Sequence, residues 1–509
     1  MHLTEWWCAA KSVPAIMTTD AIDVIVIGAG PAGMAAATTA AKGGAKVLVL
    51  DDQRTFGGQI YRNVALAGTA EAAFLGDDYM AGQSVIREFC RQDLEFRAKA
   101  TVWQVTEERQ VGYSVDGSAR MTTAPWLVLA SGALERPCPV PGWTLPGVMM
   151  AGAAQTLLKS SGLAAEGAVF AGSGPLLYLV AHQYLKAGVK IAALVDITPK
   201  SNRVGALPHL LQALRRWDLL AKGRRWISEI ANSGTPIITG VEEIKVLGDD
   251  AAMGLAFRKG VGEWHEISSP HVFLHLGVSP NVNLSLSAGL AHNWDEGQLC
   301  WRPKVDEWGV SSLPGIAVAG DSAGIGGGLA AQAGGEIAAL GILAALGLID
   351  AGARDTLARE ARKTLAREQA IRPFLDSWFR PGAELRLPRD DDTIVCRCEE
   401  LTLGDIRAVV NIGLVGPNQL KSFSRAGMGP CQGRFCGLTV QELIARQTGQ
   451  KPADVGYFRL RPPIKPLLLE ELAVGWLGGG GGMEGSIRFT DASGKCGTQR
   501  SSSGPMTCT

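Results

Sequence analysis

The sequence has no excess of charge of either sign, because 49 lysines and arginines balance 49 aspartates and glutamates in 509 residues. This balance argues against a nucleic-acid-binding protein and against a polybasic membrane surface. Cysteine is scarce: ten residues are too few for a secreted disulfide scaffold and predict a reducing cytoplasm as the location. Histidine is rarer, with seven residues, and no histidine–carboxylate grouping for general acid–base catalysis stands out. We therefore expect a chain that does not itself hold a substrate.

Long apolar runs are also few. Residues 1–20 contain Lys11 and no sustained apolar core, so an N-terminal extension is expected here rather than a signal peptide. Residues 323–349 carry Glu336 as their only charge. Their glycines and their place after a strand that ends in an acid favour a buried helix facing a nucleotide over a membrane span. The chain is too long for one core and predicts two to four domains.

A glycine motif near the start organises the rest of the chain. Apolar residues 24–27 predict a buried strand, and small residues 34–42 continue a helix. Between them, Gly28 allows a tight turn, Gly30 admits a pyrophosphate close to the backbone, and Gly33 lets the helix pack on the strand. The helix N-terminus then points its free N–H groups at the phosphates.

The acid that such a motif needs follows at the expected place. A second predicted strand, 47–50, ends in Asp51, whose carboxylate is suited to accept hydrogen bonds from a ribose. The next loop, Phe56-Gly-Gly-Gln59-Ile-Tyr-Arg62, has no cysteine. Electrons are therefore not expected to leave toward a disulfide at this point. Cys138, in a proline-rich stretch without a partner at C-x-x-C spacing, is read as an ordinary small side chain.

The motif recurs in the middle of the chain. Gly172 and Gly174 again lie between a predicted strand and a helix, and a strand over 190–195 leads to Asp196. Leu177 replaces the third glycine, so helix and strand cannot approach as closely. A second mononucleotide fold is predicted. A bound nucleotide and a fold kept only for packing both remain open.

A third strand, 315–319, leads to Gly320-Asp321 before the long apolar helix. In this order, the motifs resemble the two-domain flavoprotein fold of the thioredoxin or glutathione reductase type, over about residues 21–350. The resemblance implies FAD at the first and last motifs, and a second nucleotide, NAD(P) or ATP, at the middle one. The implied FAD ligands are Gly28, Gly30, Gly33, Asp51, Gln59 and Asp321, and those of the second nucleotide are Gly172, Gly174 and Asp196.

Four of the ten cysteines gather late in the chain, as Cys396, Cys398, Cys431 and Cys436. Four thiolates in close pairs suit tetrahedral zinc or a [2Fe-2S] cluster. The C-x-C pair is tighter than the usual C-x2-C zinc knuckle, and a flavin is expected nearby, which favours iron and sulfur. Helices are predicted over 403–411 and 438–447, with Thr402 as the N-cap of the first.

This late region resembles the bacterioferritin-associated-ferredoxin type of [2Fe-2S] domain. The run Arg425-Ala-Gly-Met-Gly-Pro-Cys-Gln-Gly-Arg-Phe-Cys436 and the later Arg459-Leu-Arg-Pro-Pro-Ile-Lys-Pro466 resemble the flavin-bearing subunits of opine oxidases, hydrogen cyanide synthase and heteromeric proline or hydroxyproline dehydrogenases. The resemblance spans about residues 21–473. It implies a partner subunit with its own flavin that oxidises an amine, and a chain that relays electrons. A small ferredoxin-like subunit, and a quinone or carrier as acceptor, are also implied.

These observations predict an α/β protein with two Rossmann-like dinucleotide-binding domains and a small helical [2Fe-2S] domain. We expect it in the cytoplasm or, through its complex, on the inner face of the membrane. A stand-alone NAD(P)H-dependent reductase is the alternative. The expected divisions are 1–20, an extension; 21–150 with 300–350, FAD-binding; 151–299, the second nucleotide; 351–392, a helical linker; 393–450, the cluster; 451–477, a C-terminal segment; and 478–509, a disordered tail.

Overall fold

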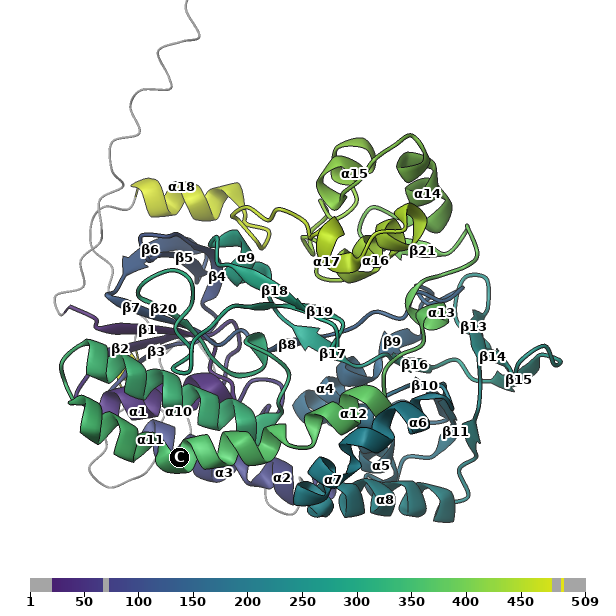
Figure 1. The fold of residues 1–509 in the computed structure, drawn as a ribbon, viewed down its shortest axis with the longest axis horizontal. Coiled ribbons are helices and arrows are strands. Elements are labelled where there is room, and N and C mark those ends of the chain that lie inside the picture. The colour runs from purple at the N-terminus through teal and green to yellow at the C-terminus, as the bar shows by residue number, and fades with distance from the viewer. Residues whose placement is uncertain (1–20, 67–72, 478–486, 489–509) are drawn as a thin grey trace, which may run out of the picture.

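The computed structural model describes residues 21–66, 73–477 and 487–488 (Figure 1). The predicted extension, 1–20, lies outside the described residues, as does nearly all of the predicted disordered tail. Within that tail, Ile487–Arg488 form a short strand, β23, which pairs antiparallel with β3. The tail prediction did not include this strand, because a glycine-rich sequence gives no alternation from which to infer one.

The first sheet has the order β20-β7-β1-β2-β3-β23, and its strands run parallel except for β23. The described strands are β1 (Val24–Ile27), β2 (Val47–Leu50), β3 (Glu95–Arg97), β7 (Trp126–Leu129) and β20 (Ile316–Val318). All residues of β1 and β2 are buried, because helices and an antiparallel layer cover both faces. Both strands match the predicted 24–27 and 47–50. The carboxyl ends of the parallel strands therefore share one edge, where Gly28, Asp51 and Asp321 follow.

Two helices cover one face of this sheet. Helix α1 (Pro31–Lys42) packs on α10 (Gly328–Ala345), and α11 (Ala351–Gln369) packs on the outer side of α10 (Figure 1). Close approach depends on Gly335, because a Cβ there would lie 2.1 Å from the Ala32 carbonyl oxygen. Helix α10 is long and apolar enough to cross a membrane, but it belongs to the core of the molecule.

The second sheet is fully parallel, with the order β12-β11-β10-β16-β9. Its strands are β9 (Val148–Met150), β10 (Ala168–Gly172), β11 (Ile191–Asp196), β12 (Ile237–Thr239) and β16 (Val272–His275). Its helices are α4 (Ala151–Ser161), α5 (Pro175–Lys186), α6 (Asn202–Ala206), α7 (Leu210–Ala213) and α8 (Trp217–Asn232), with 3-10 turns η2 (Leu207–His209) and η3 (Leu214–Arg216).

Antiparallel strands and short helices complete these two layers. They are η1 (Ala73–Leu75), α2 (Asp77–Met80), α3 (Gly82–Cys90), β4 (Thr101–Val105), β5 (Gln110–Val115), β6 (Ser118–Thr123), β13 (Glu243–Leu247), β14 (Gly254–Arg258), β15 (His265–Ser268), α9 (Asn283–Ser287), β18 (His292–Asp295), β19 (Cys300–Pro303) and η4 (Gly320–Ser322). Strands β8 (Ala133–Glu135) and β17 (Val278–Pro280) pair antiparallel where the chain passes between the two parallel sheets.

The C-terminal region is mostly helical, and its helices α14 to α17 lie above β18 and β19 in Figure 1, whereas α12 lies below them. It comprises α12 (Arg372–Trp378), α13 (Ala383–Arg386), β21 (Ile394–Cys396), β22 (Leu401–Thr402), α14 (Leu403–Asn411), α15 (Pro417–Ser424), α16 (Gly437–Thr448), α17 (Pro452–Val455) and α18 (Leu469–Leu477). The predicted N-cap is confirmed: the Thr402 hydroxyl accepts from the Asp405 amide, and the Asp405 carboxylate accepts from the Thr402 amide.

The predicted fold class, two Rossmann-like parallel sheets followed by a helical region, is confirmed. The apolar helix expected over 323–349 begins later, at Gly328. Residues 320–327 instead form η4 and a glycine loop, because the amides of Gly326 and Gly327 bond to the Asp321 carboxylate rather than to helical carbonyls.

Candidate functional site

Two glycine loops meet at the carboxyl edge of the first sheet. Gly58 has φ +59°, and a Cβ on it would lie 2.8 Å from the Gly30 Cα. Helix α1 begins at this meeting point with Gly30 as N-cap, no side chain bonded to its free amides and no acid in its first turn. Free amides and the positive end of a helix dipole form a cradle for a pyrophosphate. The residues present fit the FAD that the sequence predicts.

The predicted ligand glycines divide into two roles. Gly28 and Gly30 line a cavity of about 1630 Å³, larger than the 300–1,000 Å³ typical of one small ligand. Gly33 does not line it, and a Cβ there would lie 1.7 Å from the Gly28 carbonyl oxygen. Gly33 therefore holds the helix on its strand.

Asp51 lies beside the cradle, at the end of β2. Its Oδ2 accepts from the Ala29 amide at 2.5 Å and its Oδ1 accepts from the Gln53 amide at 2.7 Å. Burial raises the pKa of Asp51 to about 6, and the bond from Ala29 lowers it only in part. The carboxylate is therefore fixed in position, and its pKa of about 6 applies before a ligand arrives.

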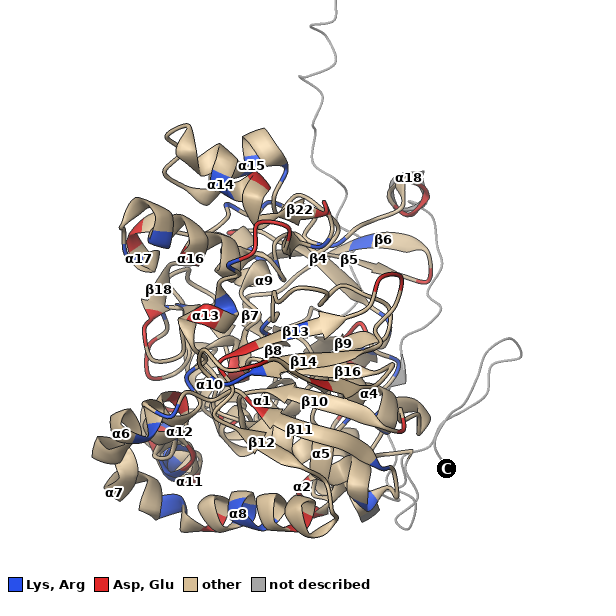
Figure 2. Cartoon of the chain, turned by 90° about the vertical axis from the view of Figure 1, so that its right-hand side faces the viewer, with Lys and Arg blue, Asp and Glu red and all other residues tan. Residues whose placement is uncertain are grey.

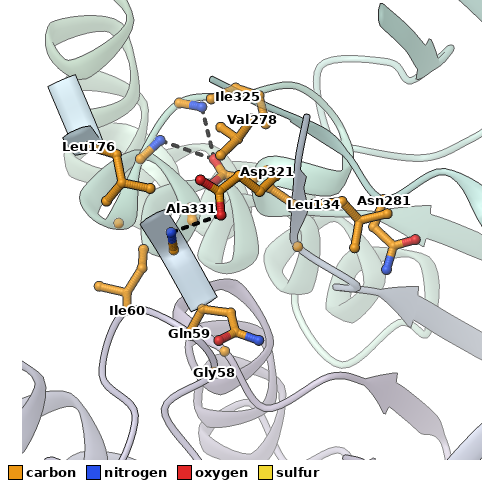
Figure 3. Close-up of a pocket in the computed structure, with 18 of the residues that line it drawn as sticks. Gly58, Gln59, Ile60, Leu134, Leu176, Val278, Asn281, Asp321, Ile325 and Ala331 are labelled. Carbon is orange, nitrogen blue, oxygen red and sulfur yellow. Dashed lines mark hydrogen bonds between the residues drawn. The ribbon is translucent and has the colours of Figure 1, made fainter. Parts of the chain in front are cut away.

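The opposite wall of the cavity carries the third motif. Figure 3 shows Asp321 beside Ala331, with Gln59 and Gly58 below them, Val278 above Asp321, and Leu134 and Asn281 to the right. The Asp321 Oδ1 accepts from the amides of Gly326 and Gly327 at 2.9 and 3.0 Å. Gln59 lines the cavity, and its Oε1 accepts from the Thr156 hydroxyl. Gly28, Gly30, Asp51, Gln59 and Asp321 are thus brought to one cavity.

Lys159 lines the same cavity and was not foreseen from the sequence. Its ammonium donates to the Gln59 and Ile60 carbonyls at 3.1 and 3.0 Å and to the Gln155 Oε1. No carboxylate pairs with it within the described residues, and burial lowers the pKa of Lys159 to about 7. Lys159 lies on α4, about 100 positions from the loop it holds, so no local sequence signal marks it.

The second nucleotide motif is arranged differently. Gly174, the N-cap of α5, lines the cavity, whereas Gly172 and Asp196 do not. The Asp196 Oδ2 accepts from the Tyr178 hydroxyl at 2.7 Å, and its Oδ1 accepts from the Thr198 amide at 2.8 Å. Asp196 therefore holds the loop after β11, as Asp51 holds the loop after β2, but only Asp51 lines the cavity.

A histidine lies against this second loop. The His275 Nδ1 is 2.5 Å from the Glu135 Oε1, and the Glu135 Oε2 accepts from the Gly152 amide at the start of α4. His275 is buried, and a Cβ on Gly174 would lie 3.0 Å from its Nε2. The pair ties β8, where the chain passes between the two parallel sheets, to β16 of the second sheet.

The four predicted ligand cysteines form two pairs. Cys396 and Cys436 are buried and hydrogen-bonded to each other, which lowers the pKa of Cys396 to about 6 and raises that of Cys436. Cys398 and Cys431 form the other pair, and burial raises the pKa of Cys398. Gly429 allows the two loops to meet, since a Cβ on it would lie 2.3 Å from the Cys398 Cβ.

No group of three or more His, Cys, Asp or Glu side chains in the described part of the chain is placed to hold a single metal ion. The cluster prediction thus stays a prediction. Cys138 is fully buried, and burial raises its pKa to about 12, as expected for a structural thiol.

Hydrogen bonds tie the cysteine region to the nucleotide-binding regions. Arg434 lines the large cavity and donates to the Cys431 carbonyl at 3.1 Å and to the Ile464 carbonyl at 2.8 Å. Asn283 of α9 donates to the Gln432 carbonyl at 2.9 Å. The cysteine pairs therefore lie next to a wall of the cavity that holds the first nucleotide motif.

The pyridine nucleotide-disulphide oxidoreductase family model matches residues 22–337 of this chain. The chain belongs to this family. It is an FAD-dependent oxidoreductase. The sarcosine oxidase A3 domain model matches residues 391–476, which contain all four clustered cysteines.

Relatives match along most of the chain. An opine oxidase subunit of Rhizobium meliloti is 42% identical over 89% of this chain and 87% of its own length. The HcnB subunit of hydrogen cyanide synthase from Pseudomonas aeruginosa is 35% identical over 87% of this chain and 96% of its own. Both are subunits of larger enzymes by name, which confirms the predicted resemblance.

L-proline dehydrogenase from P. horikoshii shares the fold, with a TM-score of 0.66 and 19% identity over 89% of this chain and 79% of that one. Although the family is named for disulphide chemistry, the loop from Asp52 to Arg62 of this chain has no cysteine. In this loop, the Tyr61 hydroxyl accepts a hydrogen bond from the Gln332 side-chain amide of α10 at 2.8 Å.

Proposed function

We propose that this chain is the electron-relaying flavoprotein subunit of a heteromeric complex that oxidises an amino acid or an opine-type secondary amine at its C–N bond. A separate flavoprotein subunit holds the substrate, and the complex also contains a small ferredoxin-like subunit. Electrons leave toward a quinone or a soluble carrier. The complex works in the cytoplasm or at the inner face of the membrane. The names of the relatives, opine oxidase and hydrogen cyanide synthase subunits, support this substrate class.

The observation that carries the proposal is the arrangement of the four cysteines in two pairs beside the FAD cavity. A [2Fe-2S] cluster takes two thiolates on each of two irons, whereas structural zinc takes four thiolates around one ion. The grouping of the four cysteines in two pairs therefore favours the two-iron cluster over zinc.

FAD takes up electron pairs and passes single electrons on, which a [2Fe-2S] cluster accepts. The chain's own residues prepare this step. Gly28 and Gly30 leave room for the pyrophosphate, and Asp321 fixes the loop at the start of α10. Arg434 places a positive charge between the cavity and Cys431. Leu134 and Val278 close the cavity with apolar side chains at the crossing of the two sheets.

The alternative, a stand-alone NAD(P)H reductase, requires a ribose at Asp196. That carboxylate does not line the cavity, whereas Asp51 of the first motif does. The geometry therefore supports the complex subunit better.

Anaerobic purification with iron, sulfide and zinc analysis tests the cluster. We expect two irons and two sulfides per chain and an electron paramagnetic resonance signal after reduction. Cys431→Ser should lose that signal and keep its flavin, because Gly28 and Gly30 belong to a different part of the molecule. Cys90→Ser, in α3, is the matched control and should keep both. One zinc per chain without sulfide would contradict the proposed relay of electrons through a [2Fe-2S] cluster.

Affinity purification of the tagged chain from its own cells tests the complex. A second flavin-containing subunit should copurify, and an amine substrate should reduce flavin only when both are present. A lone chain that oxidises NADH would favour the alternative.

A further inference from the structure

Five large apolar side chains stand exposed in one row on the segment of residues 202–232, called here the α6–α8 segment. They follow one another at spacings of three, four, three and three, which places them along one side of consecutive helical turns. The row consists of Val204, Leu207, Leu211, Leu214 and Trp217, with exposed fractions of 71, 60, 82, 50 and 67%.

This row is not the segment's inward face. Ala206 and Ala213 point inward and are fully buried against Ile371 and Phe374 of the linker, and Ile230 of α8 is buried in the main core. The segment thus has its own anchoring contacts. The exposed row is additional apolar surface that the chain's own packing does not use.

The segment carries more positive than negative side chains, and the exposed Asp78 of α2 beside it is paired with Lys222. Arg216 and Arg367 neutralise Asp218, and Lys186, Arg225 and His182 surround Glu229, so both acids of the segment are engaged. Within the described residues, Arg215 and Arg224 are exposed and form no ion pair, and neither does Lys200 just before the segment. Figure 2 shows blue segments, which mark lysine and arginine, along α8 and near α6, with red acidic segments also present on α8. A chain with zero net charge therefore carries a local basic surface here.

The segment also lies at an edge of the molecule, where a flat surface can contact it. In Figures 1 and 2, viewed at right angles, α7 and α8 run along the lower edge of the molecule. The exposed fraction of Leu211, 82%, agrees with this position.

We propose that the α6–α8 segment docks the protein on an anionic phospholipid surface. Leu207, Leu211 and Trp217 enter the boundary between headgroups and acyl chains, and Arg215 and Arg224 meet lipid phosphates. Helices of this kind lie in the plane of the membrane, with leucine and tryptophan on one face and lysine or arginine flanking it. Only α10 among the described helices is apolar enough to span a bilayer, and it is packed in the core, so the association is peripheral.

The charge pattern favours lipid over a second protein. A stable protein interface buries about 800 Å² on each side around a broad apolar centre. The α6–α8 segment offers a single row of apolar side chains bordered by unpaired cations. This inference does not depend on the proposed function.

Flotation of the purified full-length chain with vesicles tests the proposal. Vesicles of phosphatidylcholine with about one third phosphatidylglycerol should bind the chain, and vesicles of phosphatidylcholine alone should bind it weakly. Raising the salt should weaken binding, because the screening length falls from about 10 Å at 0.1 M to about 3 Å at 1 M. Failure of the wild-type chain to float with anionic vesicles at low salt would overturn the proposal.

Variants of the row separate lipid binding from other roles. Leu211→Glu with Leu214→Glu should lower binding at least tenfold, and Arg215→Gln and Arg224→Gln should each lower it about fivefold. The matched control is Leu163→Glu with Val261→Glu, which changes two exposed side chains elsewhere and should bind like the wild type. Flavin content checks folding.

Sedimentation velocity distinguishes the competing occupants. If the double variant of Leu211 and Leu214 dissociates an oligomer or releases a copurified subunit while vesicle binding persists, the row is a protein interface and the proposal is wrong. If vesicle binding falls and the sedimentation coefficient stays the same, the lipid assignment stands.

Discussion

At the scale of single residues, two glycines of the first motif have different roles: Gly30 leaves room for the ligand, and Gly33 allows the helix to pack on the strand. Gly30→Val should abolish the bound flavin while the protein still folds. A Cβ at Gly30 meets only the Gly58 Cα, at 3.8 Å, and its φ of −76° suits any residue. The added side chain therefore obstructs the pyrophosphate and not the chain. Flavin absorbance per chain measures the loss, and retention of stoichiometric flavin would contradict the assignment.

Gly33→Ala is the informative comparison for that variant. Its Cβ would lie 1.7 Å from the Gly28 carbonyl oxygen, so the helix must move. Thermal unfolding should show a clear loss of stability even without cofactor, whereas Gly30→Val should unfold like the cofactor-free wild type.

The raised pKa of Asp51 predicts that FAD binding depends on pH. Its pKa in the free protein is raised to about 6 by burial. A ribose hydroxyl donates to the ionised carboxylate, so protons compete with FAD below that pH. The dissociation constant should therefore rise about tenfold per pH unit below 6 and level off above it. Fluorescence titration of the cofactor-free protein measures this. Asp51→Asn should bind weakly at every pH, and an unchanged slope in that variant would assign the titration elsewhere.

The sequence predicted those parts of the site that depend on local chemistry. Gly28, Gly30 and Asp51 lie at fixed distances along one strand–turn–helix–strand unit, and the structure brings all three to one cavity. Lys159 and His275 could not be predicted as part of the site, because their hydrogen-bond partners lie about 100 and 140 positions away in the sequence. Gly57-Gly58 was visible in the sequence, but its contact with Gly30 depends on how the loop folds back.

At the scale of elements, α16 carries a buried ionic link between the cysteine region and the rest of the molecule. Glu442 on α16 pairs with Arg386 of α13 and lies 3.8 Å from Arg136 next to β8. All three side chains are buried, and burial lowers the pKa of Arg386 to about 9. Two cations therefore share one buried anion.

Glu442→Gln should destabilise the protein by about 3–5 kcal/mol, because it leaves two buried guanidiniums without a counter-charge. Urea unfolding followed by circular dichroism measures the change, and limited proteolysis should show earlier release of the cysteine region. Glu384→Gln removes an exposed partner of Arg389 and is expected to cost at most about 1 kcal/mol. Equal effects in the two variants would mean that the buried network does not hold the region.

Helices and strands were predicted most accurately where a single sequence pattern determines their ends. Strands 24–27 and 47–50 and the helix 403–411 match β1, β2 and α14 residue for residue. The apolar helix began five residues later than predicted, because hydrophobicity does not reveal that Asp321 captures the amides of the glycine loop. Strand β23 pairs with β3 across the whole chain, a contact that no local pattern encodes.

At the scale of the whole molecule, the cavity joins both Rossmann-like sheets to the cysteine region. Gly30, Gly174 and Arg434 all line it, although they come from three separate regions of the chain. The sequence predicted three regions but not their contact, since the contact depends on buried side chains such as Arg136 and Asn283 that carry no motif. One cavity that reaches all three regions suits electron transfer within the chain.

The same arrangement predicts how the intact protein responds to reduced nicotinamides. Stopped-flow mixing of the isolated chain with NADH or NADPH should bleach the flavin little, whereas dithionite should bleach it fully. Asp196 does not line the cavity and is held by Tyr178 and Thr198, so it is not placed to accept from a ribose in that cavity. Tyr178→Phe frees one oxygen of Asp196 but does not move the carboxylate into the cavity, and it should stay as slow as the wild type. Rapid bleaching by either nucleotide in the wild type would favour the NAD(P)H reductase over the complex subunit as the function of this chain. Rapid bleaching only in Tyr178→Phe would show instead that the hydroxyl of Tyr178 is what closes a working nicotinamide site.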